Sequence, residues 1–124
     1  MIDLIIFDLD GVLVDTEDIH YNSLLHCIST ITTLSTHDIK SIVRRDGTTT
    51  KSKLIELQRV FEISDSDLQI IDRLKQELVL KEFQKLVPDQ RQIDMLRELE
   101  LLVPVLAIGS NSRKENVETI LDAL

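Results

Sequence analysis

The 124-residue chain is poor in cysteine and in aromatic residues, and each shortage excludes a class of protein. Cys27 is the only cysteine, so the sequence cannot form a disulfide of its own, which fits a reducing compartment such as the cytoplasm. Aromatic residues make up 3% of the sequence, too few for a platform on which nucleic-acid bases stack. A disulfide-stapled secreted domain and a base-stacking domain are therefore excluded.

Basic residues are also in the minority. The sequence has 14 Lys and Arg against 22 Asp and Glu, which leaves a net charge of −8, and no basic stripe is present. Such a chain repels the phosphates of nucleic acids and of anionic membranes. No apolar run reaches the roughly 20 residues of a membrane span. No basic segment precedes the apolar N-terminus, as it would in a signal peptide. We therefore expect a cytoplasmic domain that binds neither nucleic acid nor membrane.

Two short apolar segments lie on either side of a long region with helical periodicity. They fall near residues 2–8 and near residues 103–108. Continuous rather than alternating hydrophobicity is typical of strands buried on both faces of a parallel sheet. We therefore predict an α/β fold: a partial Rossmann-like core with an inserted α-helical cap. The predicted core comprises residues 1–15 and 88–124, and the predicted cap comprises residues 16–87.

Polar residues that can cap helix N-termini mark where the predicted helices begin. The candidates are Asp15 or Thr16, Thr36, Ser64 or Ser66, and Asp89, and the last helix begins near Arg113.

Two aspartates follow the first predicted strand. Asp8 and Asp10 lie at the carboxyl end of that strand, where open α/β sheets bind ligands. Carboxylates this close repel each other unless a cation or a proton joins them. Mg²⁺ commonly binds one or two carboxylates together with substrate phosphate oxygens. Gly11 lets the backbone turn sharply after the second acid. The alternative is an acidic turn without a ligand.

A second polar turn, Gly109-Ser110-Asn111-Ser112, follows the second predicted strand. A serine hydroxyl and the N–H groups of a turn that opens a helix can hold a phosphate oxygen. The alternative role of Ser-Asn-Ser is to cap the N-terminus of the following helix.

The stretch from Met1 to Glu17 resembles motif I of the haloacid dehalogenase superfamily, in its phosphatase and phosphomutase branch. That motif is an apolar strand, D-x-D-G, an apolar flap and D-[ST]-E, and His20-Tyr21 resembles the residues that follow it in members like phosphoglycolate phosphatase and β-phosphoglucomutase. The resemblance implies that Asp8 is a nucleophile that forms an aspartyl-phosphate. It also implies that Asp10 protonates the leaving oxygen and then activates water.

By the same resemblance, Asp8 and the main-chain carbonyl of Asp10 bind Mg²⁺. Ser110 and Asn111, in the position of motif II, bind the phosphate. The presence of Asp10 favours phosphate esters, because an alkoxide leaving group needs a proton and a halide does not. The implied substrate is a small phosphorylated metabolite, and a phosphomutase is an alternative to a phosphatase.

The region between the two motifs resembles the helical cap of these enzymes, and residues 47–54 match its specificity loop. The residues that we expect to contact substrate from the cap region are Thr16, His20, Thr50, Lys53 and Lys75. The alternatives are that the lysines are solvated surface residues and that His20 has a packing role.

The superfamily's motif III lysine and motif IV acids lie downstream of motif II, and this sequence ends at Leu124. The resemblance thus covers roughly the front half of a family member. We expect low activity, and an apolar strand edge covered by self-association or by the missing half. The alternative function is a non-catalytic remnant or protein-binding module that keeps the phosphate-binding turn.

Overall fold

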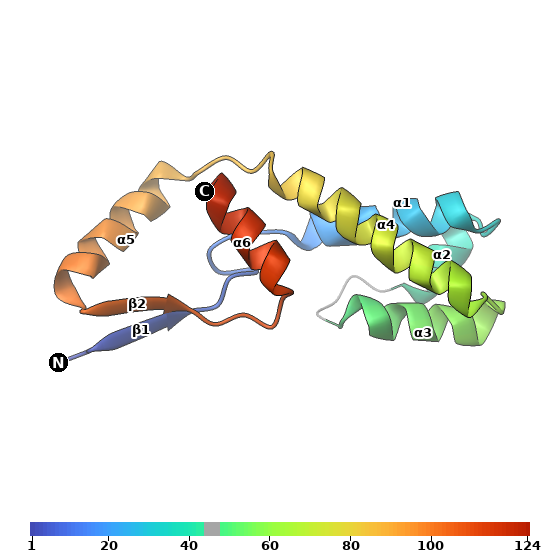
Figure 1. The fold of residues 1–124 in the computed structure, drawn as a ribbon, viewed down its shortest axis with the longest axis horizontal. Coiled ribbons are helices and arrows are strands. Elements are labelled where there is room, and N and C mark those ends of the chain that lie inside the picture. The colour runs from blue at the N-terminus through green and yellow to red at the C-terminus, as the bar shows by residue number, and fades with distance from the viewer. Residues whose placement is uncertain (44–47) are drawn as a thin grey trace. The chain divides into compact units, whose positions relative to one another are not determined.

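The computed structural model describes residues 1–43 and 48–124 (Figure 1). The elements are, in chain order, β1 (Leu4–Phe7), α1 (Glu17–Ile31), α2 (Thr36–Ile42), α3 (Thr50–Phe61), α4 (Asp65–Phe83), α5 (Gln90–Leu102), β2 (Val105–Ile108) and α6 (Lys114–Ala123). The predicted α/β class with a helical insertion is confirmed. No helix of the described part of the chain is long and apolar enough to span a bilayer.

The second strand is shorter than the predicted segment 103–108, for a reason that lies in its first two residues. The N–H of Val103 still donates to Leu99 O of α5, so Val103 belongs to the helix end. Pro104 has no N–H to donate to a strand neighbour. The strand therefore begins at Val105.

The chain divides into two compact units. The strand-containing unit comprises Met1–Thr16 and Leu80–Leu124, and the helical unit comprises Glu17–Val79. The predicted division lay after residues 15 and 87, whereas the second division falls within α4. This helix runs without a break from Asp65 to Phe83, so no loop separates the units at that point.

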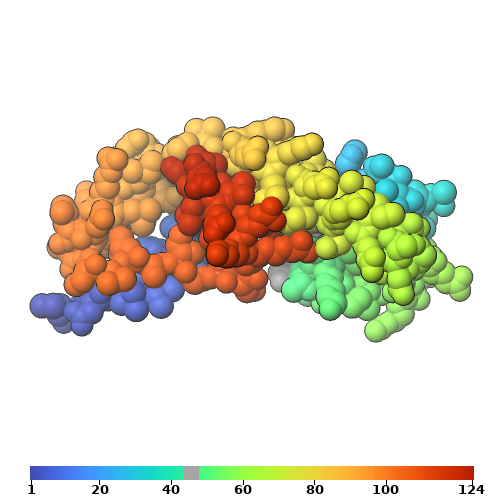
Figure 2. All heavy atoms as spheres, in the orientation of Figure 1, coloured from blue at the N-terminus to red at the C-terminus, as the bar shows by residue number. Residues whose placement is uncertain are grey.

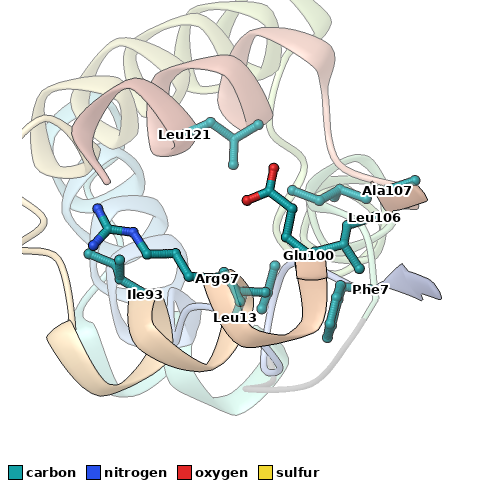
Figure 3. A pocket seen from close by; sticks show the side chains of 10 residues that line it. Phe7, Leu13, Ile93, Arg97, Glu100, Leu106, Ala107 and Leu121 are labelled. Carbon is teal, nitrogen blue, oxygen red and sulfur yellow. The ribbon is translucent and has the colours of Figure 1, made fainter. Parts of the chain in front are cut away.

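The two strands form a parallel pair in which Leu4 lies opposite Val105 and Phe7 opposite Ile108. One face of this sheet lies opposite α5 and α6, and an open groove of about 500 Å³ separates them (Figure 3). The groove is lined by Phe7, Leu13, Ile93, Leu96, Arg97, Glu100, Leu106, Ala107, Ile108 and Leu121. In β1 the exposed Leu4 and Ile6 alternate with the half-buried Ile5 and Phe7, as the period of two in a strand requires.

The opposite side of the sheet carries exposed apolar side chains. Leu4 is 49%, Ile6 61% and Val105 50% exposed. Among the described residues β1 pairs only with β2, so its other edge presents unpaired backbone groups. In the space-filling view β1 (blue) lies at the margin of the strand-containing unit (Figure 2).

The helical unit has an apolar core of its own. Residues from all four helices are buried in it, because each helix places apolar residues on one face. The buried members are Leu24, Cys27, Ile28, Ile39, Val43, Leu54, Leu57, Ile63 and Ile71.

Side chains cap several helices, with one shift from the predicted positions. Ser35, not the predicted Thr36, caps α2, because its hydroxyl accepts from the N–H of Asp38 at 3.1 Å. Ser64 accepts from Asp67 N–H at 3.1 Å before α4, and Asp89 accepts from Arg91 N–H at 3.0 Å before α5, as predicted. The alternative that Ser110 to Ser112 cap the last helix is wrong: α6 begins at Lys114 with Arg113 as the N-cap residue.

We expect Ile71→Ala to lower the free energy of unfolding by about 2–5 kcal/mol, because it opens a cavity where a side chain is fully buried. Ile55→Ala is the matched control: Ile55 is also helical and in the same unit but is 44% exposed, so about 1 kcal/mol or less is expected. Urea unfolding followed by circular dichroism measures both. Equal losses would contradict the assignment of this core.

Candidate functional site

The two predicted motifs leave the sheet at the same edge. Asp8 follows Phe7 at the end of β1, and Ser110 lies two residues after Ile108, the last residue of β2. The N–H of Gly109 donates to Phe7 O at 2.8 Å, which continues the pairing of the strands past their ends. Because both strands run in the same direction, their carboxyl ends and the loops that follow lie side by side.

A tight loop anchored by Leu9 holds the two aspartates. The carbonyl of Leu9, whose side chain is fully buried, accepts from the N–H groups of Val12, Leu13 and Val14 at 3.3, 2.9 and 3.1 Å. Gly11 has φ +78°, a conformation that side-chain-bearing residues rarely adopt. Its N–H donates to Val14 O. The sharp turn that the sequence predicted at Gly11 is present.

Asp10 receives a hydroxyl group on each carboxylate oxygen. Thr16 donates to Oδ1 and Ser112 donates to Oδ2, both at 2.5 Å. Thr16 is 1% exposed and comes from the same loop, whereas Ser112 comes from the loop after β2. The carboxylate of Asp10 is thus fixed between the two motifs. Sequence reasoning missed Ser112, although the Ser-x-Ser repeat in the turn was a signal for it.

Asp8 and Ser110 offer a different pair of groups. The side chain of Asp8 is exposed, and its Oδ1 accepts from the N–H of Leu9 at 2.8 Å. Ser110 is half-buried and its Oγ accepts from the N–H of Ser112 at 3.1 Å. A hydroxyl that accepts a hydrogen bond keeps its own proton for another acceptor, such as a phosphate oxygen. Asn111, the other predicted phosphate ligand, is exposed.

The sequence matches the family model of the haloacid dehalogenase-like hydrolases over residues 5–124. The chain belongs to this family. Searches of curated proteins and of solved structures returned no match.

Enzymes of the haloacid dehalogenase-like family generally use Mg²⁺. Mg²⁺ binds one or two carboxylates and completes its shell with water and phosphate oxygens. The exposed carboxylate of Asp8 fits this role, and the main-chain carbonyl of Asp10 fits better than its side chain, whose two oxygens are already bonded to hydroxyls. Within residues 1–43 and 48–124, no group of three or more His, Cys, Asp or Glu residues could hold a metal by itself.

Three of the predicted cap residues of this hydrolase come together in the helical unit. Lys75 of α4 lies 3.0 Å from His20 Nδ1 of α1 and donates to Thr50 Oγ1 of α3, also at 3.0 Å. Lys75 is only 5% exposed, so the alternative of a solvated lysine does not apply to it. Lys53 is half-buried on α3, and Thr16 is grouped with Asp10 instead. Of the predicted loop 47–54, Gly47 lies outside the described residues.

Burial in the core of the helical unit raises the pKa of the Cys27 thiol above its ordinary value of 9.0, and the nearby charge of Lys75 opposes this rise. Burial has the larger effect because a thiolate loses its hydration there. The pKa of the Cys27 thiol is therefore higher in the folded chain than in the unfolded chain. The resulting contribution of Cys27 to the free energy of unfolding is fully present below about pH 9. That contribution is lost as the pH rises, because the unfolded chain releases the proton first.

We therefore expect the free energy of unfolding of the wild-type chain to fall more steeply above pH 9 than that of Cys27→Ala, by at most about 1.4 kcal/mol per pH unit. Urea unfolding of both proteins between pH 7.5 and pH 10 measures the difference. The variant also serves as the control for every other ionisable group, because those groups are the same in both proteins. Parallel curves would contradict the raised pKa.

Proposed function

We propose that this chain carries the nucleophile, the acid–base group and the phosphate-binding turn of a Mg²⁺-dependent phosphatase that acts on a small phosphate ester. The observation that carries the proposal is the Gly109–Phe7 hydrogen bond, which joins the ends of the two strands. It supports a shared site for Asp8, Asp10 and Ser110. A cytoplasmic location is part of the proposal and is supported by the lone, buried thiol of Cys27.

In the first step, an oxygen of Asp8 attacks phosphorus and the bond from phosphorus to the ester oxygen breaks. Asp10 gives its proton to that oxygen, so an alcohol leaves. In the second step, water attacks phosphorus while Asp10 takes a proton from it. The bond between Asp8 and phosphorus breaks, inorganic phosphate leaves, and both carboxyl groups return to their starting states. Ser110 donates to a phosphate oxygen throughout.

Charge is the main obstacle to the first step. A carboxylate and one phosphate charge repel by about 4 kcal/mol at 4 Å with moderate screening. When bound, Mg²⁺ supplies the positive charge that offsets this repulsion. Asp8 and the main-chain carbonyl of Asp10 would hold the ion beside the phosphate.

We expect Asp8→Asn to lower the Mg²⁺-dependent hydrolysis of p-nitrophenyl phosphate by about 10³-fold or more, as the loss of a covalent nucleophile does in other enzymes. The substitution removes the attacking charge but keeps the size of the side chain. Initial rates by absorbance measure the effect.

Asp3→Asn is the matched control for this experiment. It makes the same change of charge at an exposed residue that precedes β1, so full activity is expected. Equal rates for wild type and Asp8→Asn would contradict the proposed phosphatase function. They would favour the alternative, a non-catalytic protein that binds phosphate.

We further propose that the open edge of β1 pairs with a second copy of the chain. A two-stranded sheet is marginally stable alone, and exposed apolar strand edges are sites of association. The exposure of Leu4 and Ile6 supports this pairing.

Light scattering after size exclusion is expected to give a mass above the 14.2 kDa of one chain. Ile6→Lys, which places a charge beside the edge, is expected to shift the protein toward the monomer. Ile55→Lys, at an exposed helical isoleucine of the other unit, is the control and leaves the mass unchanged. A wild-type chain that is wholly monomeric would refute the pairing.

A further inference from the structure

Ser112 joins the two loops of the site through two hydrogen bonds. Its hydroxyl donates to Asp10 Oδ2, a residue 102 positions earlier in the chain. Its N–H donates to the hydroxyl oxygen of Ser110 at 3.1 Å. One residue therefore connects the group assigned to proton transfer with the group assigned to phosphate binding.

We propose that Ser112 is a positioning residue that orients the carboxyl group of Asp10 for proton transfer to the leaving oxygen. This inference rests on the proposed phosphatase function, which gives Asp10 its acid–base role.

The geometry explains why a second hydroxyl is needed. Thr16 holds one oxygen of Asp10, but a carboxyl group held at one oxygen can still turn about its Cβ–Cγ bond. The bond from Ser112 to the other oxygen fixes the plane of the group. Proton transfer requires a donor and an acceptor within about 2.6–3.2 Å in a suitable alignment, so a carboxyl group that turns freely is a poorer acid.

The link to Ser110 adds a second constraint. Because the backbone of Ser112 holds the Ser110 hydroxyl, the same turn sets the position of the bound phosphate relative to Asp10. The ester oxygen that must be protonated is attached to that phosphate. Ser112 thereby fixes the acid with respect to the atom that receives its proton.

The role predicts a dependence on the leaving group. Ethoxide cannot leave without a proton, whereas p-nitrophenolate is stable enough to leave without one. A general acid contributes about 10²–10⁴-fold, so misplacing it is expected to slow ethyl phosphate hydrolysis by about 10²-fold. For p-nitrophenyl phosphate, whose leaving group bypasses the acid, kcat/KM covers only the first step and is expected to fall by about 3-fold or less by the same reasoning.

The experiment compares kcat and KM for the two phosphate esters, with Mg²⁺, in the wild-type chain and in a set of variants. Ser112→Ala and Ser112→Cys remove the hydroxyl in two different ways, so that one folding failure does not end the test. Ser112→Thr keeps the hydroxyl and is expected to retain wild-type kcat for ethyl phosphate. Ser29→Ala is the control, because Ser29 lies on α1 and its hydroxyl bonds to the carbonyl of His26.

A second comparison tests whether Ser112 acts through Asp10. In the Asp10→Ala background the hydroxyl of Ser112 has no carboxylate to orient, so adding Ser112→Ala is expected to cause no further loss of kcat. A further loss in that background, or a change confined to KM, would mean that Ser112 contacts the phosphate itself and would overturn the inference.

The remaining outcomes separate the two proposals. If the wild-type chain is more active than Asp8→Asn but Ser112→Ala lowers kcat/KM for both esters equally or not at all, the phosphatase function is supported and the positioning role is wrong. If the wild-type chain is no more active than Asp8→Asn, the proposed phosphatase function is wrong. The positioning role of Ser112, which depends on that function, is then wrong as well.

Discussion

The parallel pairing of β1 with β2 is the interaction on which the site depends. It brings Phe7 opposite Ile108, and the Gly109–Phe7 hydrogen bond extends the pairing to the point where the loops begin. The approach is close: a side-chain carbon at residue 109 would lie 3.1 Å from Ile6 Cγ2, so glycine suits this position. Without this pairing, Asp10 and Ser112 would not lie within hydrogen-bond distance.

A long insertion between two paired strands costs less than its length suggests. The entropy of closing a loop grows with the logarithm of its length, by about 0.6 kcal/mol for each doubling. The helical unit Glu17–Val79 also buries an apolar core of its own, which stabilises it independently of the sheet. The motif after β1 can therefore be followed by a large insertion while the strands keep their register.

The features that could be predicted from the sequence are those with local causes. Continuous apolar runs predicted both strands, and Asp8, Asp10 and Ser110 follow them directly. Contacts between distant side chains could not be predicted in this way. Ser112 lies 102 positions from Asp10, and Lys75 lies 55 positions from His20. In the sequence each of these polar residues is indistinguishable from a surface residue. Only the pairing of the strands and the packing of the helices make them partners.

The chemistry of the partners of Asp10 is informative. Both are hydroxyls, and a hydroxyl can donate a hydrogen bond or accept one. In the proposed reaction Asp10 gives up a proton and later regains it. As a carboxylate its oxygens only accept hydrogen bonds, whereas as a carboxylic acid its O–H also donates one. Lysine or arginine in the places of Thr16 and Ser112 would bind only the carboxylate, since these side chains have no acceptor. Two hydroxyls hold the same carboxyl group in either protonation state, which is what an acid that must become a base requires.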